Sequence, residues 1–261
     1  MDFWEVLFDD FDIKLLIFAR ILGIFSFNPI LSRSNIPARV RVGATLLITY
    51  VVALTLDVGA VDTGNTMGEY VMCFVRELFI GVVLGFVCDM FVYMLYLAGD
   101  VMDAQAGLGM AKVFDPSTSI QMSMYGSYAG FMMYLYFFAS NAHLTLIRIF
   151  VDSFEILPLC SGYVNADLGW QITEMFSHIL VLMMQLAMPV IAAELIVEFC
   201  VGVLMKAVPQ IQIMVVNIQL KVIFGFIVLF AITSPLGDFI ADYTDKMLNT
   251  CRDILPYILQ S

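Results

Sequence analysis

Six long apolar stretches dominate the sequence of this chain of 261 residues. A helix needs about 20 predominantly apolar residues to cross the hydrocarbon core of a bilayer, and helices satisfy their own backbone there. Because the connections between the stretches are short, the sequence predicts an all-α, polytopic membrane-type protein of about six long apolar helices, folded as kinked hairpins. The expected helices cover approximately Ile13–Leu31, Val42–Leu56, Val71–Gly99, Ile120–Phe138, Ile179–Met205 and Ile211–Thr233, with a long link at Val151–Gly169.

Composition supports this interpretation. Hydrophobic residues make up 61% of the chain and charged residues only 13%, whereas a soluble domain has about 45–50% apolar and about 25% charged residues. Too few polar side chains remain to cover a water-exposed surface, so lipid or apolar protein must surround the helices. With 12 basic against 23 acidic residues, the chain also lacks the basic surface that nucleic-acid binding requires.

Several ionisable residues lie inside or beside the apolar stretches. Each unpaired charge at a bilayer centre costs on the order of 2.5–3.5 kcal/mol or more, so we expect these side chains to form inter-helix or inter-subunit ion pairs. Glu194 and Glu198 share a helix face and repel each other unless a cation lies opposite, which Lys206, Lys221 or an arginine of another subunit could supply. The full set is Arg20, Arg76, Glu77, Asp89, Glu194, Glu198, Lys206 and Lys221.

Two other interpretations of these charges stay open. A proton or ion pathway would use Asp89, Glu194, Glu198 and His178. A metal site would require His143 and His178 to converge with the glutamates, but the two histidines lie in unrelated sequence contexts. We therefore expect no metal site.

Catalytic motifs are not found in the sequence. The stretch Gly107–Met110 has methionine where an intramembrane aspartyl protease has its aspartate, and neither a P-loop nor a dinucleotide fingerprint occurs. The five cysteines are widely spaced and form no CxxC motif, so they predict neither a zinc site nor a disulfide framework. We expect no catalytic residues and no cofactor.

Glycine and proline mark close packing and bends. Gly81 and Gly85 form a small-xxx-small face, which allows close contact with a helix of this chain or of a partner. Pro189 and Pro209 lie in or beside apolar stretches and are expected to bend them. A second group of small residues, which includes Gly107, precedes an Asp-Pro pair and predicts either an ordinary loop or a movable constriction.

An ordered series of residues and short motifs extends from about Phe11 to Pro235. It comprises Arg20, Pro29, Arg39, Arg76-Glu77, Gly81, Gly85, Gly107-Leu108-Gly109, Asp115-Pro116, Asn141-Ala142-His143, Asp152-Ser153-Phe154, Pro158, Ala187-Met188-Pro189, Pro209-Gln210, Asn217 and Gln219-Leu220-Lys221. This series resembles the FliR/SctT family of type III export-gate proteins. One position departs from the family pattern, because Ala142 stands where a glycine is expected before His143.

This resemblance implies a role in flagellar protein export. Proteins of the family assemble with FliP and FliQ into a channel for unfolded flagellar subunits, with FlhB and FlhA beneath it, in the bacterial inner membrane at the flagellar basal body. It further implies a single domain over 1–261, with FliP-like hairpins at about 1–150 and a FliQ-like hairpin at about 170–261. Alternatives are an injectisome export subunit and, from another class, a secondary transporter or ion channel.

The resemblance also implies a pore plug after the third apolar stretch. The expected plug loop includes Gly107, Leu108, Gly109, Met110, Ala111, Lys112, Phe114, Asp115 and Pro116.

Overall fold

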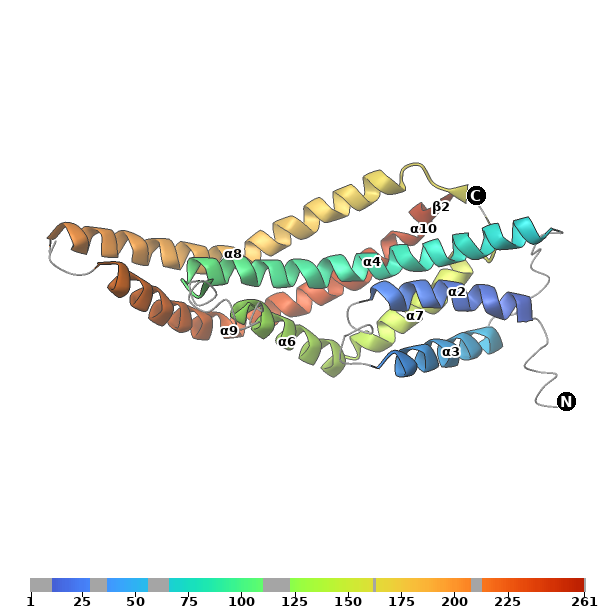
Figure 1. Ribbon diagram of the computed structural model, residues 1–261, viewed down its shortest axis with the longest axis horizontal. Helices are drawn as coiled ribbons and strands as arrows, with labels where there is room; N and C mark the ends of the chain where they lie inside the picture. Colours follow the sequence, from blue (N-terminus) through green and yellow to red (C-terminus); the bar gives the residue numbers. More distant parts are fainter. Residues whose placement is uncertain are drawn as a thin grey trace. The chain divides into compact units, whose positions relative to one another are not determined.

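The computed structural model describes residues 11–28, 37–55, 66–109, 123–161, 163–207 and 213–260, and nearly all of them are helical (Figure 1). The predicted all-α, membrane-type class is therefore confirmed. A pair of two-residue strands, β1 (Tyr163–Val164) and β2 (Leu259–Gln260), is the exception among the described residues. The helices are α2 (Phe11–Phe27), α3 (Ala38–Thr55), α4 (Met67–Gln105), α6 (Met124–Ala139), α7 (Ala142–Ile156), α8 (Leu168–Ala207), α9 (Ile213–Asp253) and α10 (Leu255–Ile258).

The helices differ in length from the apolar stretches. α4, α8 and α9 contain 39, 40 and 41 residues, whereas α2 and α6 contain only 17 and 16. Within the described residues, four helices are long and apolar enough to cross a membrane: Ala38–Thr55, Met67–Gln105, Leu168–Leu204 and Asn217–Asp253. The long helices continue through residues of weak helix propensity because tertiary packing overrides propensity. In the last part of α9, for example, Tyr243, Met247 and Cys251 are buried.

The link expected at Val151–Gly169 is shorter than predicted, which corrects that boundary. α7 continues to Ile156, because its apolar residues recur with helical spacing and bury one face. The buried face consists of Ala142, Leu146, Ile149, Phe150, Ser153 and Phe154.

The chain divides into two compact units. The first comprises Met1–Met90, Asn141–Met175 and Met247–Ser261, and the second comprises Phe91–Ser140 and Phe176–Lys246. α4, α8 and α9 each contribute one part to each unit.

In the first unit, α2 and α4 pack backbone against backbone. A Cβ atom at Gly81 would overlap the Arg20 carbonyl oxygen, and one at Gly85 would lie 2.7 Å from the Ile24 carbonyl oxygen. The glycine face noted in the sequence is thus in contact with a helix of the same chain. This close approach places residues on α2 directly beside the α4 turn that carries Glu77.

In the second unit, α6 packs on α4 in the same manner. A Cβ atom on Gly99 would overlap the Gly126 backbone. α8 and α9 each continue through an internal proline, Pro189 and Pro235, and the two prolines line one cavity together with Phe239. Pro209, which was expected to bend a helix, lies outside the described residues.

Large apolar side chains remain exposed along α3, α8 and α9 of the isolated chain. Surfaces of this size are rare on soluble monomers and indicate contact with lipid or with other protein. The most exposed examples on these three helices are Leu47, Leu54, Trp170, Ile196, Phe199 and Phe230.

Candidate functional site

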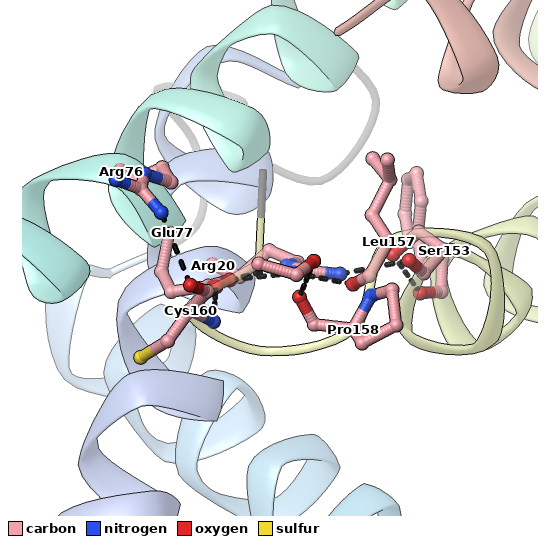
Figure 2. Close-up of polar contacts among 9 residues, drawn as sticks. Arg20, Arg76, Glu77, Ser153, Leu157, Pro158 and Cys160 are labelled. Atoms are coloured by element: carbon pink, nitrogen blue, oxygen red, sulfur yellow. Dashed lines mark hydrogen bonds and ion pairs between the residues drawn. The ribbon is translucent and has the colours of Figure 1, made fainter. Parts of the chain in front are cut away.

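The first unit contains a fully buried ion pair. Arg20 on α2 donates from Nε to Glu77 Oε2 on α4 at 2.7 Å, and both side chains have no solvent exposure. Figure 2 shows the guanidinium lying between α4 and the end of α7. A buried charge pair is tolerated only when further hydrogen bonds satisfy its remaining atoms.

Arg20 donates those bonds to carbonyl groups at the C-terminal end of α7. One terminal nitrogen donates to the Ser153 carbonyl oxygen at 2.8 Å and the other to the Leu157 carbonyl oxygen at 2.9 Å. The guanidinium carbon also lies 4.3 Å from the centre of the Phe154 ring. Because the last carbonyls of a helix lack partners within it and carry partial negative charge, the arginine acts as the C-terminal cap of α7.

Glu77 completes the network through the connection that follows α7. Its Oε1 accepts a hydrogen bond from the Cys160 amide at 3.1 Å, and the neighbouring Arg76 donates to the Cys160 carbonyl at 3.1 Å. Two consecutive residues of α4 therefore hold both sides of Cys160, which adopts a left-handed φ of 59°. Burial, together with Cys73 and Glu77, raises the pKa of the Cys160 thiol to about 12.

This arrangement fits a structural role. Arg20 and Glu77 have used their hydrogen-bonding atoms on each other and on the backbone, so neither is open to a substrate. In the part of the chain that the structure describes, no three histidine, cysteine or acidic side chains converge as a metal site.

The second unit contains the base of the expected plug loop. Asp103, near the end of α4, accepts hydrogen bonds from the Met124 amide at 2.7 Å and the Tyr125 amide at 3.0 Å. Ser123 accepts another from the Gly126 amide at 2.9 Å, as an N-cap residue. The chain therefore leaves α4 and enters α6 at adjacent points.

Of the expected plug residues, the structure describes Gly107, Leu108 and Gly109. Gly107 has a φ of +74°, and the Leu108 amide donates to the Asp103 carbonyl at 3.0 Å, which is the glycine-terminated helix end of a Schellman motif. The remaining expected plug residues lie outside the described residues: Met110, Ala111, Lys112, Phe114, Asp115 and Pro116.

The other expected charges divide into three groups. Lys221 on α9 pairs with Glu198 on α8 at 3.1 Å, and 53% of the Glu198 side chain is exposed. Glu194, one turn earlier, is buried, and neither of its oxygens has a hydrogen-bond partner among the described residues. Asp89 is half-buried and Lys206 exposed, and neither is in an ion pair with another described residue.

Some residues of these sites were not expected from the sequence. Arg20 bonds to the backbone carbonyls of Ser153 and Leu157, and every residue has such a carbonyl, so the side-chain types give no signal. Asp103 belongs to no recognisable motif near the end of its long helix. The N-cap preference of Ser123 was a usable signal for the start of α6, but nothing in the sequence identifies Asp103 as the partner of that helix start.

Comparison with known proteins supplies independent information. The family described as "Bacterial export proteins, family 1" matches residues 12–247. The chain is 28% identical over 236 residues to the flagellar biosynthetic protein FliR of Escherichia coli K12, which covers 90% of each protein. It is 26% identical to FliR of Bacillus subtilis, over 96% of this chain and 97% of that protein.

A protein whose name does not refer to the flagellum is also similar. Surface presentation of antigens protein SpaR of Shigella flexneri is 23% identical over 224 residues, or 84% of each chain. The family match and these three similarities all extend over most of the sequence.

Proposed function

This chain belongs to the bacterial export proteins of family 1, and from that membership we propose that it is an integral subunit of the flagellar type III protein export gate. The observation that carries the proposal is the extent of similarity: proteins named flagellar biosynthetic protein FliR align over at least nine-tenths of this chain in two distant bacteria. The helical, membrane-type fold agrees with that role.

The proposed partners are FliP and FliQ in the gate, with FlhB and FlhA beneath it and unfolded flagellar proteins as substrates. Exposed apolar side chains on α3, α8 and α9 support assembly within a membrane complex, because such faces must be covered by lipid or by neighbouring helices. The proposed location is the inner membrane at the flagellar basal body. Residues 1–150 would supply FliP-like hairpins, and the α8–α9 hairpin within 170–261 would supply the FliQ-like part.

Within the gate, the segment that begins at Gly107 is proposed to act as a plug. Its ends are held together by Asp103 and the first amides of α6, and by the close approach of Gly99 to Gly126. A segment with a fixed base can change conformation without separating the helices that carry it. The role is steric and requires no catalytic residue.

The similarity to SpaR supports a second candidate, an injectisome export subunit. A secondary transporter is the alternative from another class, because charges lie within apolar helices. It would be active alone in liposomes, whereas an export-gate subunit would be inactive without its partners.

Purification of the tagged full chain from its own cells in mild detergent, followed by mass spectrometry, tests the proposal. We expect FliP and FliQ to co-purify with the chain. Recovery of their injectisome counterparts would assign the chain to the second candidate. A monomer or homo-oligomer isolated from cells that express FliP and FliQ would contradict the flagellar proposal, and the same result from cells that also express the injectisome counterparts would contradict both.

A deletion tests the plug. Removing residues 107–112 is expected to make the assembled gate leak ions, because it removes residues of the proposed plug. Residues 113–122 are still long enough to connect α4 and α6, whose neighbouring ends are joined by the hydrogen bond between Asp103 and the Met124 amide. A Gly/Ser segment of the original length is the matched control for connectivity, and it should leak as well if the native side chains close the pore. A deletion variant that assembles and stays sealed would contradict the plug.

A further inference from the structure

Glu194 has a buried carboxyl group without a hydrogen-bond partner among the described residues, and the proposed export role does not explain it. It lies on α8 with a relative exposure of 1%. Neither oxygen accepts a hydrogen bond from any residue in the described part of the chain. A buried carboxylate ion without hydrogen bonds is strongly disfavoured, and such a group takes up a proton instead.

Residues of three other segments lie near this side chain, on α9, on α6 and directly after α4. A Cβ atom at Gly225 on α9 would lie 3.4 Å from Glu194 Oε1, 3.3 Å from the Tyr125 hydroxyl of α6 and 3.0 Å from the Ala106 side chain that follows α4. The Tyr125 hydroxyl donates to the Gly225 carbonyl at 2.6 Å, so its hydrogen is already used. Glu194 therefore faces neither water nor an available donor at this point.

The charged groups facing Glu194 are Lys221 on α9 and Glu198 on its own helix, and both lie within electrostatic range of it. Lys221 is paired with Glu198 at 3.1 Å. One ammonium group cannot neutralise two carboxylates that repel each other across one helical turn. The exposed Glu198 carboxylate pairs with the lysine, and the buried Glu194 carboxyl is left without an ion-pair or hydrogen-bond contact among the described residues.

We propose that Glu194 is a proton-binding site, protonated while Lys221 pairs with Glu198, and that Lys221 can exchange between the two carboxyl groups with release of that proton. On exchange, the Lys221–Glu198 contact breaks, a Lys221–Glu194 contact forms, and the proton leaves Glu194 for a base in solution. Protein rearrangement is required, because Glu194 is enclosed in the present conformation.

The site lies under the base of the expected plug loop. Gly107 lies two residues after the end of α4. A Cβ atom there would be 3.6 Å from Lys221 Cβ and 4.0 Å from Lys221 Cδ, and Ala106 meets the Gly225 position beside Glu194. The aliphatic part of the lysine that exchanges between the carboxyl groups therefore packs beside this glycine.

Infrared spectroscopy of the full chain, purified with the subunits that accompany it, tests the inference. A protonated carboxylic acid has a carbonyl stretch separate from that of a carboxylate, and subtracting the Glu194→Gln spectrum from that of the wild type isolates the Glu194 band. We expect one such band per chain at neutral pH. Glu198→Gln is the matched control on the same helix face.

The control also tests the exchange. In Glu198→Gln, Lys221 loses its partner and is expected to pair with Glu194, so the band should disappear. Adding Lys221→Met to Glu198→Gln should restore it. A wild-type minus Glu194→Gln difference spectrum without a protonated-acid carbonyl band would overturn the proton site. A band that persists in Glu198→Gln would overturn the exchange.

A variant that keeps the acid covers the case in which Glu194→Gln does not fold. Glu194→Asp must shift the band, and an unchanged band in that variant would overturn its assignment to Glu194. The inference concerns a proton on this chain and does not depend on which partners co-purify with it.

Discussion

Replacing Arg20 with methionine is expected to be one of the most damaging single changes in the first unit. The substitution keeps a long apolar side chain but removes the charge that faces Glu77, whose side chain has no solvent exposure. Breaking a buried ion pair by removing one partner costs about 3–5 kcal/mol, because the other charge is left uncompensated. The Ser153 and Leu157 carbonyls also lose a donor, although Ser153 keeps its bond from the Leu157 amide.

A double replacement distinguishes the free-energy cost of the uncompensated Glu77 charge from the cost of the lost hydrogen bonds to the backbone. In Arg20→Met with Glu77→Leu no buried charge remains, and replacing a whole ion pair by apolar residues is often close to neutral. The Cys160 amide and the Leu157 carbonyl still lack partners, at about 1–3 kcal/mol for each buried group. We therefore expect the double variant to be no less stable than Arg20→Met, although it lacks one more side chain of the network.

The assay is thermal unfolding of the detergent-purified chain, followed by size-exclusion chromatography of the surviving folded fraction. A loss of about 3–5 kcal/mol corresponds to a fall in Tm of roughly 6–20 °C for a unit of this size. Lys246→Met is the control, because it breaks an exposed pair with Asp242, and such pairs contribute about 0–1 kcal/mol. Equal shifts for Arg20→Met and Lys246→Met would refute the reasoning.

Three further predictions follow from packing, capping and burial. Gly81→Ala should prevent the close approach of α2 to α4 and sharply reduce the yield of folded protein. Gly43→Ala is the control, because a Cβ atom there meets nothing within 4 Å, and it should raise stability by about 0.5–1 kcal/mol. Size-exclusion chromatography measures the folded yield of both variants, and similar yields would contradict the prediction. Asp103→Ala should cost about 1 kcal/mol by removing the acceptor at the start of α6 and should increase ion leakage through the assembled gate, measured as conductance. Partial burial raises the pKa of the half-exposed Cys160 to about 12, so its thiolate is scarce at pH 8 and alkylation in the folded chain should be slow there. Peptide mass spectrometry measures the rate of alkylation, and rapid labelling of Cys160 at pH 8 would contradict the raised pKa.

Local sequence signals located much of the helical structure but not its boundaries. Apolar runs predicted helices in every region where α2, α3, α4, α6, α8 and α9 occur, because a lipid-facing helix needs a run of apolar side chains. They did not predict α7, whose apolar residues recur every three or four positions and form no continuous run. They also placed the ends of α4 and α9 too early and the start of α8 too late, since a helix can continue through polar residues beyond its apolar stretch.

The candidate sites divide in the same way. The apolar stretches around Arg20, Glu77, Glu194 and Lys221 already indicate that these charges need partners, because an unpaired charge in an apolar environment is costly. Which partners they have depends on the fold: Arg20 meets a carbonyl 133 positions away in the sequence, and Lys221 pairs with Glu198 while Glu194 has no hydrogen-bond partner among the described residues. An apolar stretch can be seen in the sequence, whereas a hydrogen bond needs two atoms brought within about 3 Å of each other by segments that can be far apart along the chain.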